Sequence, residues 1–156
     1  MQLWIVRHGE AEPCQTSDEL RALTTQGQHD IQALASVLKQ QAITPQRVLV
    51  SPYLRTQQTW AILQAGNAWS QVAEVSDQIT PDAAISDALQ LLQGAQTTLM
   101  VSHQPLVSQL LAVLIDGHGR YAIDYPMYPG SVACLHLDAW LPGAAKLDAL
   151  LSPPYE

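Results

Sequence analysis

Short apolar runs alternate along the chain with longer segments whose apolar residues recur at helical spacing. The short runs predict buried strands, because a strand covered on both faces is apolar throughout. They lie at residues 3–6, 48–50, 97–101 and 132–137, with a shorter run at 72–75. The longer segments predict helices at residues 25–41, 51–65, 81–92 and 106–115.

This alternation favours an α/β fold, a three-layer α/β/α sandwich around a mainly parallel sheet. Residues 146–151 follow a Pro-Gly turn and are expected to pair back as an antiparallel edge strand. Ser51 followed by Pro52 is typical of a helix start, with the serine as the cap. We expect residues 1–156 to form one domain that ends in a loose tail, residues 152–156.

Composition and charge exclude several classes of protein. With 47% hydrophobic and 13% charged residues, the chain lacks the bias of a disordered protein. Its formal net charge of -7 opposes broad binding to nucleic acid or anionic lipid. No run approaches the roughly 20 apolar residues of a membrane span, and no secretory signal is recognisable. Cys14 and Cys134 form neither a disulfide framework nor a metal-ligand spacing. We expect a cytoplasmic monomer without nucleic-acid or membrane partners.

Three polar motifs follow predicted strands at the point where each strand ends. The carboxyl ends of parallel strands meet in one crevice, so the motif side chains should face a common point. A phosphate dianion suits that point, because the planar guanidinium of arginine binds two oxygens at once and a helix start adds positive potential. The motifs are Arg7-His8-Gly9, the segment from Ser51 to Arg55, and Ser102-His103.

The same residues predict phosphoryl transfer without a metal or another cofactor. The sequence has no P-loop and no paired aspartates at metal-binding spacing. Arginines can neutralise the phosphate in place of Mg²⁺, and a neutral imidazole can be the nucleophile. Gly9 directly follows His8, and a residue without Cβ lets the backbone approach the phosphate closely.

Taken together, the motifs resemble those of the histidine phosphatase superfamily, the phosphoglycerate-mutase-like proteins. The resemblance rests on Arg7-His8-Gly9, Ser51-Pro52-x-Leu54-Arg55-Thr56-x-Gln58-Thr59 and Ser102-His103. Further strings are similar to the SixA-type protein-phosphohistidine phosphatases, and the similarity covers residues 1 to about 138. These strings are Ser17-Asp18-x-x-Arg21-x-Leu23-Thr24-x-x-Gly27, Val48-Leu49-Val50-Ser51-Pro52 and Ser102-His103-x-Pro105-Leu106-Val107.

The resemblance implies specific roles. His8 would be the nucleophile that becomes phosphorylated, and Arg7, Arg55 and His103 would complete the phosphate pocket. Larger members of the superfamily add an acidic proton donor and a lid after the third strand, and neither is recognisable in the short segment 72–81. This departure suits a phosphoramidate, because a protonated imidazole is a good leaving group. It also suits an open site that a protein domain carrying phosphohistidine can reach.

The sequence leaves the roles of several neighbouring residues open. Asp18 and Arg21 either orient the substrate at the rim or lock the loop through a local salt bridge. Ser131 either presents a backbone N–H to the phosphate or serves only a turn. Glu10 and Glu12 lie beside the nucleophile, as proton donors or as solvated loop residues.

Two other functions remain open at this point. The same chemistry can serve a small-molecule phosphate monoester, for which a carboxylic proton donor in the pocket would be the signal. A phospho-ligand binding module without catalysis is the other alternative. A nucleophilic imidazole argues against that module, because binding alone does not need one.

Overall fold

A mixed β-sheet forms the centre of the molecule. The structure, a computed structural model, describes residues 1–94 and 96–155, and within them six strands form one sheet. Their order across the sheet is β3 (Glu74–Val75), β2 (Arg47–Val50), β4 (Thr98–Ser102), β1 (Gln2–Arg7), β5 (Val132–Leu137) and β6 (Ala145–Leu151).

The strand directions confirm an α/β fold with a mainly parallel sheet. β3, β2, β4 and β1 run parallel to one another. β5 runs antiparallel to β1, and β6 pairs antiparallel with β5 at the edge of the sheet. The reversal of direction therefore begins at β5, one strand before the edge. The carboxyl ends of β1, β2 and β4 lie next to one another because these strands are direct neighbours.

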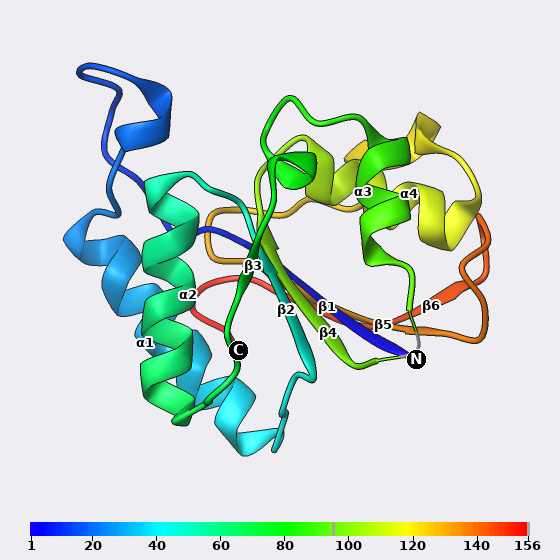
Figure 1. Cartoon of the computed structure of the whole chain (residues 1–156), viewed down its shortest axis with the longest axis horizontal. Helices are drawn as coiled ribbons and strands as arrows, with labels where there is room; N and C mark the ends of the chain where they lie inside the picture. Colours follow the sequence, from blue (N-terminus) through cyan, green and yellow to red (C-terminus); the bar gives the residue numbers. More distant parts are fainter. Residues whose placement is uncertain (95, 156) are drawn as a thin grey trace.

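Helices cover the sheet on both faces (Figure 1). α1 (Thr25–Gln40) and α2 (Leu54–Asn67) lie on one face, and α3 (Ile85–Leu92) and α4 (Leu106–Asp116) lie on the other. Short 3-10 helices occur in the connections: η1 (Asp18–Leu20), η2 (Asp77–Ile79) and η3 (Gly119–Asp124). Across the described residues, no helix combines the length and apolar character needed to cross a membrane.

Alternation along β1 builds the two apolar layers of the sandwich. Leu3 and Ile5 belong to the core under α3 and α4, whereas Trp4 and Val6 belong to the core under α1 and α2. Successive side chains of a strand point to opposite faces, so a strand buried on both faces must be apolar at every position. This is why residues 3–6 read as a continuous apolar run.

Three elements start two or more residues away from the predicted position. α2 begins at Leu54 rather than at Ser51, because the Ser51 hydroxyl bonds a histidine of the site instead of capping the helix. α3 begins at Ile85 rather than at residue 81, since a turn closed by the Ala83 N–H and the Thr80 carbonyl precedes it. β3 is shorter than the predicted strand at 72–75.

The prediction of a loose tail is wrong for residues 152–155, which dock onto the body of the protein. The Tyr155 hydroxyl donates to the Gly130 carbonyl at 2.8 Å, and the hydroxyls of Ser152 and Ser131 lie 2.7 Å apart. Gly130 has φ +82°, and a Cβ there would approach the Tyr155 hydroxyl to 3.0 Å. The tail fits against this turn because glycine leaves room for it.

Candidate active site

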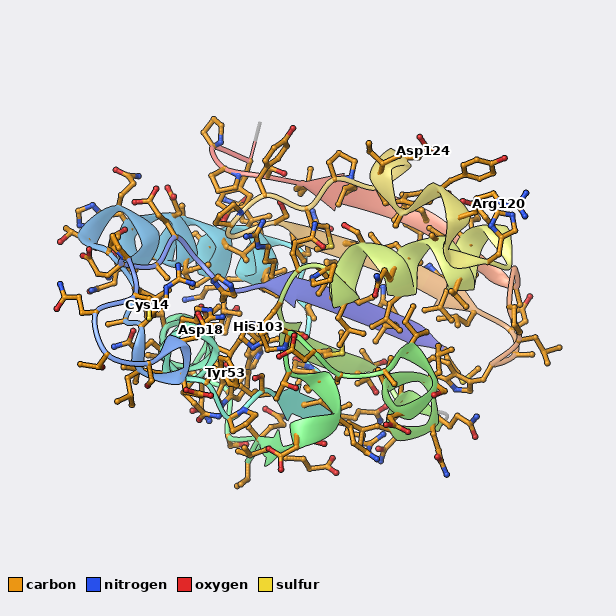
Figure 2. The ribbon with its side chains drawn as sticks, turned by 90° about the horizontal axis from the view of Figure 1, so that it is seen from above. Cys14, Asp18, Tyr53, His103, Arg120 and Asp124 are labelled. Carbon is orange, nitrogen blue, oxygen red and sulfur yellow. The ribbon has the colours of Figure 1, made fainter. Side chains whose placement is uncertain are left out.

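The three polar motifs converge where β1, β2 and β4 end, as the topology predicts. Arg7 pairs with Ser102 in the β1–β4 ladder, so the residues that follow them, His8 and His103, are neighbours. Their ring centroids lie 5.2 Å apart. Figure 2 shows Asp18, Tyr53 and His103 gathered at one end of the molecule, although they come from different segments of the chain.

His8 is a buried imidazole with one nitrogen fixed and the other directed at a guanidinium. Its side chain is buried, and Nδ1 lies 2.7 Å from the Gly9 carbonyl, to which only an N–H can donate. Nε2 accepts a hydrogen bond from Nε of Arg55 at 3.2 Å. Burial, together with the smaller effect of the nearby arginines, lowers the pKa of His8 to about 4, although the Gly9 hydrogen bond acts to raise it. At neutral pH the ring is therefore uncharged, with a lone pair on Nε2.

Arg55 is held in a buried position by three partners. It is the second residue of α2, so it stays within the first turn, where the helix dipole is positive. Besides His8, it donates to the Asp18 carbonyl at 2.7 Å and to the Asp18 carboxylate at 3.1 Å. The ring of Tyr53 lies 5.0 Å from its guanidinium carbon. The planar fork of Arg55 is thus preorganised beside Nε2 of His8.

Two further side-chain nitrogens beside His8 are buried without partners among the described residues. Arg7 uses one terminal nitrogen on the Met127 carbonyl at 2.8 Å, but its Nε has no partner within the described part of the chain. The same holds for Nδ1 of His103, a side chain that is 1% exposed. Burial lowers the pKa of Arg7, and the charges of Arg55 and Arg21 lower it further. Unpaired buried donors among gathered positive charges favour an anion as the missing partner.

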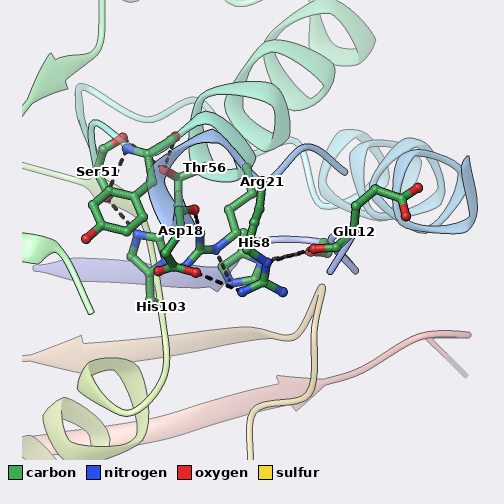
Figure 3. Close-up of polar contacts among 10 residues, drawn as sticks. His8, Glu12, Asp18, Arg21, Ser51, Thr56 and His103 are labelled. Carbon is green, nitrogen blue, oxygen red and sulfur yellow. Dashed lines mark hydrogen bonds and ion pairs between the residues drawn. The ribbon is translucent and has the colours of Figure 1, made fainter. Parts of the chain in front are cut away.

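Asp18 and Arg21 lie at the rim of the site and form the local salt bridge that was one of the two alternatives from the sequence. Asp18 bridges Arg21, at 3.0 Å, and Arg55 through its two carboxylate oxygens (Figure 3). Arg21 also donates to the Glu12 carbonyl at 2.7 Å, which fixes the loop. Burial raises the pKa of Asp18, but hydrogen bonds from Arg21 and Arg55 outweigh it, so the net pKa lies below its ordinary value. Asp18 is therefore an ionised carboxylate at the mouth of the site.

Gly9 and Ser131 lie beside the nucleophile, but their backbone N–H groups are engaged within the protein. The Gly9 N–H donates to the Thr59 hydroxyl at 3.2 Å, and a Cβ on Gly9 would lie 2.9 Å from Ile31. Glycine is therefore required here by the close approach of α1. The Ser131 N–H donates to the Tyr128 carbonyl, while its own carbonyl accepts from the Arg7 N–H. In this structure Ser131 supports the backbone of the nucleophile strand.

Two side chains of the site were given no role in the pocket by the sequence interpretation. Ser51 is fully buried, and its hydroxyl lies 2.7 Å from Nε2 of His103. The ring of Tyr53 packs edge-on against the same imidazole, with ring centroids 4.9 Å apart. Both lie inside the segment from Ser51 to Arg55 that the sequence singled out. Their contacts with His103 could be found only from the structure.

The carboxylates considered as proton donors lie in surface positions. Glu10 and Glu12 are exposed, and the Glu10 carboxylate accepts from the Thr24 hydroxyl at 2.9 Å. Glu74 forms a salt bridge with Arg47 at 2.8 Å. Within residues 1–94 and 96–155, no group of three or more His, Cys, Asp or Glu side chains is arranged to hold a metal ion.

Comparisons with known proteins agree with this geometry. Residues 3–79 match the histidine phosphatase superfamily (branch 1). Phosphohistidine phosphatase SixA of Escherichia coli K12 is 40% identical over 124 residues, covering 75% of this chain and 76% of that protein. The chain belongs to the histidine phosphatase superfamily.

Other relatives extend the match over more of the chain. A SixA homolog of Haemophilus influenzae is 35% identical over 152 residues, which cover 88% of this histidine phosphatase and 89% of the homolog. The structure of protein histidine phosphatase SixA complexed with tungstate superposes with a TM-score of 0.88 at 33% identity, covering 99% and 98% of the two chains. This histidine phosphatase is thus an enzyme, a phosphatase of the SixA type, with the same fold as that structure.

Proposed function

We propose that this phosphatase removes phosphate from phosphohistidine on a protein, without a metal ion and through a phosphoenzyme intermediate on His8. The observation that carries the proposal is the pair of unpartnered buried donors, Nε of Arg7 and Nδ1 of His103, beside a neutral His8. A tetrahedral oxyanion can accept from both. The SixA relative was solved with tungstate, an anion of that shape.

The first step is an in-line attack on phosphorus. The lone pair of His8 Nε2 forms the new P–N bond while the bond between phosphorus and the substrate imidazole breaks. Its electron pair stays on the leaving nitrogen. The Nδ1–H of His8 remains on the Gly9 carbonyl, which stabilises the positive charge that develops on the ring. Arg55 and Arg7 neutralise the phosphoryl oxygens, the task that Mg²⁺ performs in many phosphotransferases. In a second step water attacks the phosphorus of phospho-His8, and the P–N bond to His8 breaks with its electron pair returning to Nε2. The water oxygen and its protons leave as inorganic phosphate, and His8 is again a neutral imidazole.

The ionised state of Asp18 favours phosphohistidine over an alcohol ester as the substrate. An alkoxide leaving group needs a proton, and a carboxylate whose pKa is held low by Arg21 and Arg55 is a poor donor. A phosphohistidine ring that already carries a proton on its other nitrogen leaves as neutral imidazole and needs no donor. The site as built therefore suits a P–N bond.

The short segments that border the site suit a protein substrate. Between β3 and α3 the chain makes only η2 and a turn, and the other border is the loop that carries η1. Leu20 on η1 is 65% exposed, next to Asp18. An exposed apolar side chain at the mouth is suited to contact with a protein surface. The curated relatives are phosphohistidine phosphatases by name, which supports the same substrate class.

The test is a comparison of kcat/KM across a matched panel: a phosphohistidine protein domain, phosphoramidate, a phosphoserine peptide and a sugar phosphate. We expect the phosphohistidine domain to be preferred, and a chelator to leave its rate unchanged. Preference for the sugar phosphate would make the enzyme a small-molecule phosphatase. A rate lost to the chelator and restored by Mg²⁺ or Zn²⁺ would contradict the metal-independent mechanism.

The intermediate is tested separately by stopping the reaction rapidly. We expect acid-labile, base-stable phosphate on His8, located by mass spectrometry, and none in His8→Ala. His29→Ala is the matched control, because His29 is an exposed histidine of α1 and should leave the label intact. Label on another residue of the wild-type enzyme would overturn the assignment of the nucleophile.

A further inference from the structure

His103 is a buried imidazole whose two ring nitrogens have different surroundings. The imidazole is 1% exposed, and burial, together with the smaller effects of His8 and Arg55, lowers its pKa to about 2. The ring is therefore neutral and carries a single proton. Only a proton on Nδ1 lets that nitrogen donate, and Nδ1 is the ring nitrogen without a partner among the described residues.

The hydrogen bonds of Ser51 determine where this proton lies. The Ser51 hydroxyl lies 2.7 Å from Nε2 of His103 and accepts the Tyr53 N–H at 3.4 Å. A hydroxyl has one hydrogen to donate, and within residues 1–94 and 96–155 the acceptor in reach is Nε2 of His103. If Nε2 carried the proton instead, the fully buried hydroxyl would have no acceptor, and an unsatisfied buried donor is costly.

The position of the Ser51 hydroxyl is itself fixed by its surroundings. The Ser51 N–H donates to the Val101 carbonyl at 3.2 Å. The Ser51 carbonyl accepts from the Thr56 hydroxyl and from the Gln57 side-chain amide, each at 2.9 Å. The Thr56 contact is visible in Figure 3. With its backbone held on both sides, Ser51 keeps its hydroxyl aimed at the imidazole.

We propose that Ser51 is a positioning residue: it donates to Nε2 of His103, holds the proton on Nδ1, and so makes His103 a donor to the transferring phosphoryl group. The inference rests on the proposed function, in which His103 contacts that group. The opposite tautomer would present a lone pair to an anionic oxygen and oppose the reaction. Because the phosphoryl oxygens need the donor most in the transition state, the effect falls on kcat more than on KM.

The first measurement needs no substrate and is therefore independent of the proposed function. Two-bond ¹⁵N–¹H correlations of the unliganded enzyme report which nitrogen of His103 is protonated. We expect an Nδ1–H ring in the wild type and in Ser51→Thr, which keeps the hydroxyl. In Ser51→Ala we expect a mixture of tautomers or the Nε2–H form. An Nε2–H ring in the wild type would overturn the inference, whatever the enzyme hydrolyses.

The second measurement is kinetic. We expect Ser51→Ala to lower kcat on the order of 10-fold with little change in KM, since an oxyanion donor is weakened rather than removed. Vanadate should bind more weakly by a similar factor, and Ser51→Cys, with a weak S–H donor, should lie in between. Full kcat together with an unchanged tautomer in folded Ser51→Ala would show that the serine has no positioning role.

Ser102→Ala is the matched control for both measurements. Ser102 is also fully buried and lies next to His103 in the chain, but its hydroxyl donates to the Ile79 carbonyl at 2.7 Å. The substitution removes a buried hydroxyl without touching the imidazole. We expect reduced stability, an unchanged Nδ1–H tautomer and a smaller loss of kcat than in Ser51→Ala. An equal loss of kcat in both variants would assign the Ser51 effect to folding rather than to the proton on His103.

Discussion

The Nε–H of Arg55 donates to Nε2 of His8 across 3.2 Å, so the nitrogen proposed to attack phosphorus is already paired with a pocket arginine before substrate arrives. In the proposed mechanism, bound phosphate would offer this guanidinium stronger acceptors and would free the lone pair of His8. We therefore expect Arg55 both to bind the phosphate and to release the nucleophile.

Arg55→Ala should reduce kcat by about 10²–10³-fold, the usual cost of losing one preorganised donor to a developing anion. Arg55→Lys should also be poor, because lysine keeps the charge but not the planar fork. Arg47→Lys is the control, since Arg47 binds Glu74 at the sheet edge. Steady-state kinetics on folded variants decides the matter, and full kcat/KM in Arg55→Lys would exclude a bidentate clamp.

His8 should titrate far below an ordinary histidine. Burial and the neighbouring arginines lower its pKa to about 4, so protonation removes the Nε2 lone pair only below that pH. We expect the NMR titration midpoint of His8 near 4 and an upward shift in Arg55→Gln, which removes a nearby positive charge. A midpoint close to 6.5 would mean that the ring is not buried as described.

The same lowered pKa makes stability depend on pH. Below about pH 6.5 the unfolded chain protonates His8, whereas the folded chain does so only near 4. The free energy of unfolding should therefore fall as pH drops from 6.5 to 4, by up to about 1.4 kcal/mol per pH unit for one such histidine. Urea unfolding at several pH values should show that the free energy of unfolding changes less with pH in His8→Gln than in the wild type. An equal pH dependence in both proteins would contradict the coupling between His8 protonation and stability.

Asp18→Asn should strengthen the binding of small anions. The Asp18 carboxylate occupies Arg55 and Arg21 in the unliganded site and repels an incoming dianion. Because the contact is partly exposed, we expect a gain of less than about tenfold in vanadate affinity. Glu19→Gln is the control, since Glu19 is an exposed neighbour of Asp18 and removes the same charge. An equal gain in vanadate affinity in both variants would indicate an effect of net charge rather than competition between Asp18 and the anion for the arginines.

Tyr155→Phe should reduce the free energy of unfolding by about 1 kcal/mol, because it removes a hydrogen bond to Gly130 but keeps the packed ring. Tyr128→Phe is the control, since its side chain is 62% exposed. Chemical denaturation measures both. If Tyr155→Phe unfolds at the same denaturant midpoint as the wild type, the hydrogen bond of the tail to Gly130 contributes nothing to stability.

Much of the fold and of the site could be predicted because the signals are local. An apolar run predicts a strand wherever both faces are covered, and β1 illustrates this with side chains in both cores. Motifs at the ends of neighbouring parallel strands must converge, so His8, Arg55 and His103 could be brought together without coordinates. The start of α2 could not be predicted in the same way. Ser51 and Pro52 form the pattern of a helix cap, but the Ser51 hydroxyl contacts His103 instead.

The sequence by itself determined the α/β architecture, the superfamily and the principal residues of the pocket, because periodicity and short motifs carry that information. Only the tertiary structure decided that Ser51 serves His103, that Asp18 joins two arginines, that Gly9 makes room for α1 and that Tyr155 anchors the tail. Each of these features includes a contact between residues far apart in the sequence, and the contact of Asp18 with Arg55 joins η1 to α2. Their partners are selected by packing and by the need to satisfy buried polar groups, which no local pattern records.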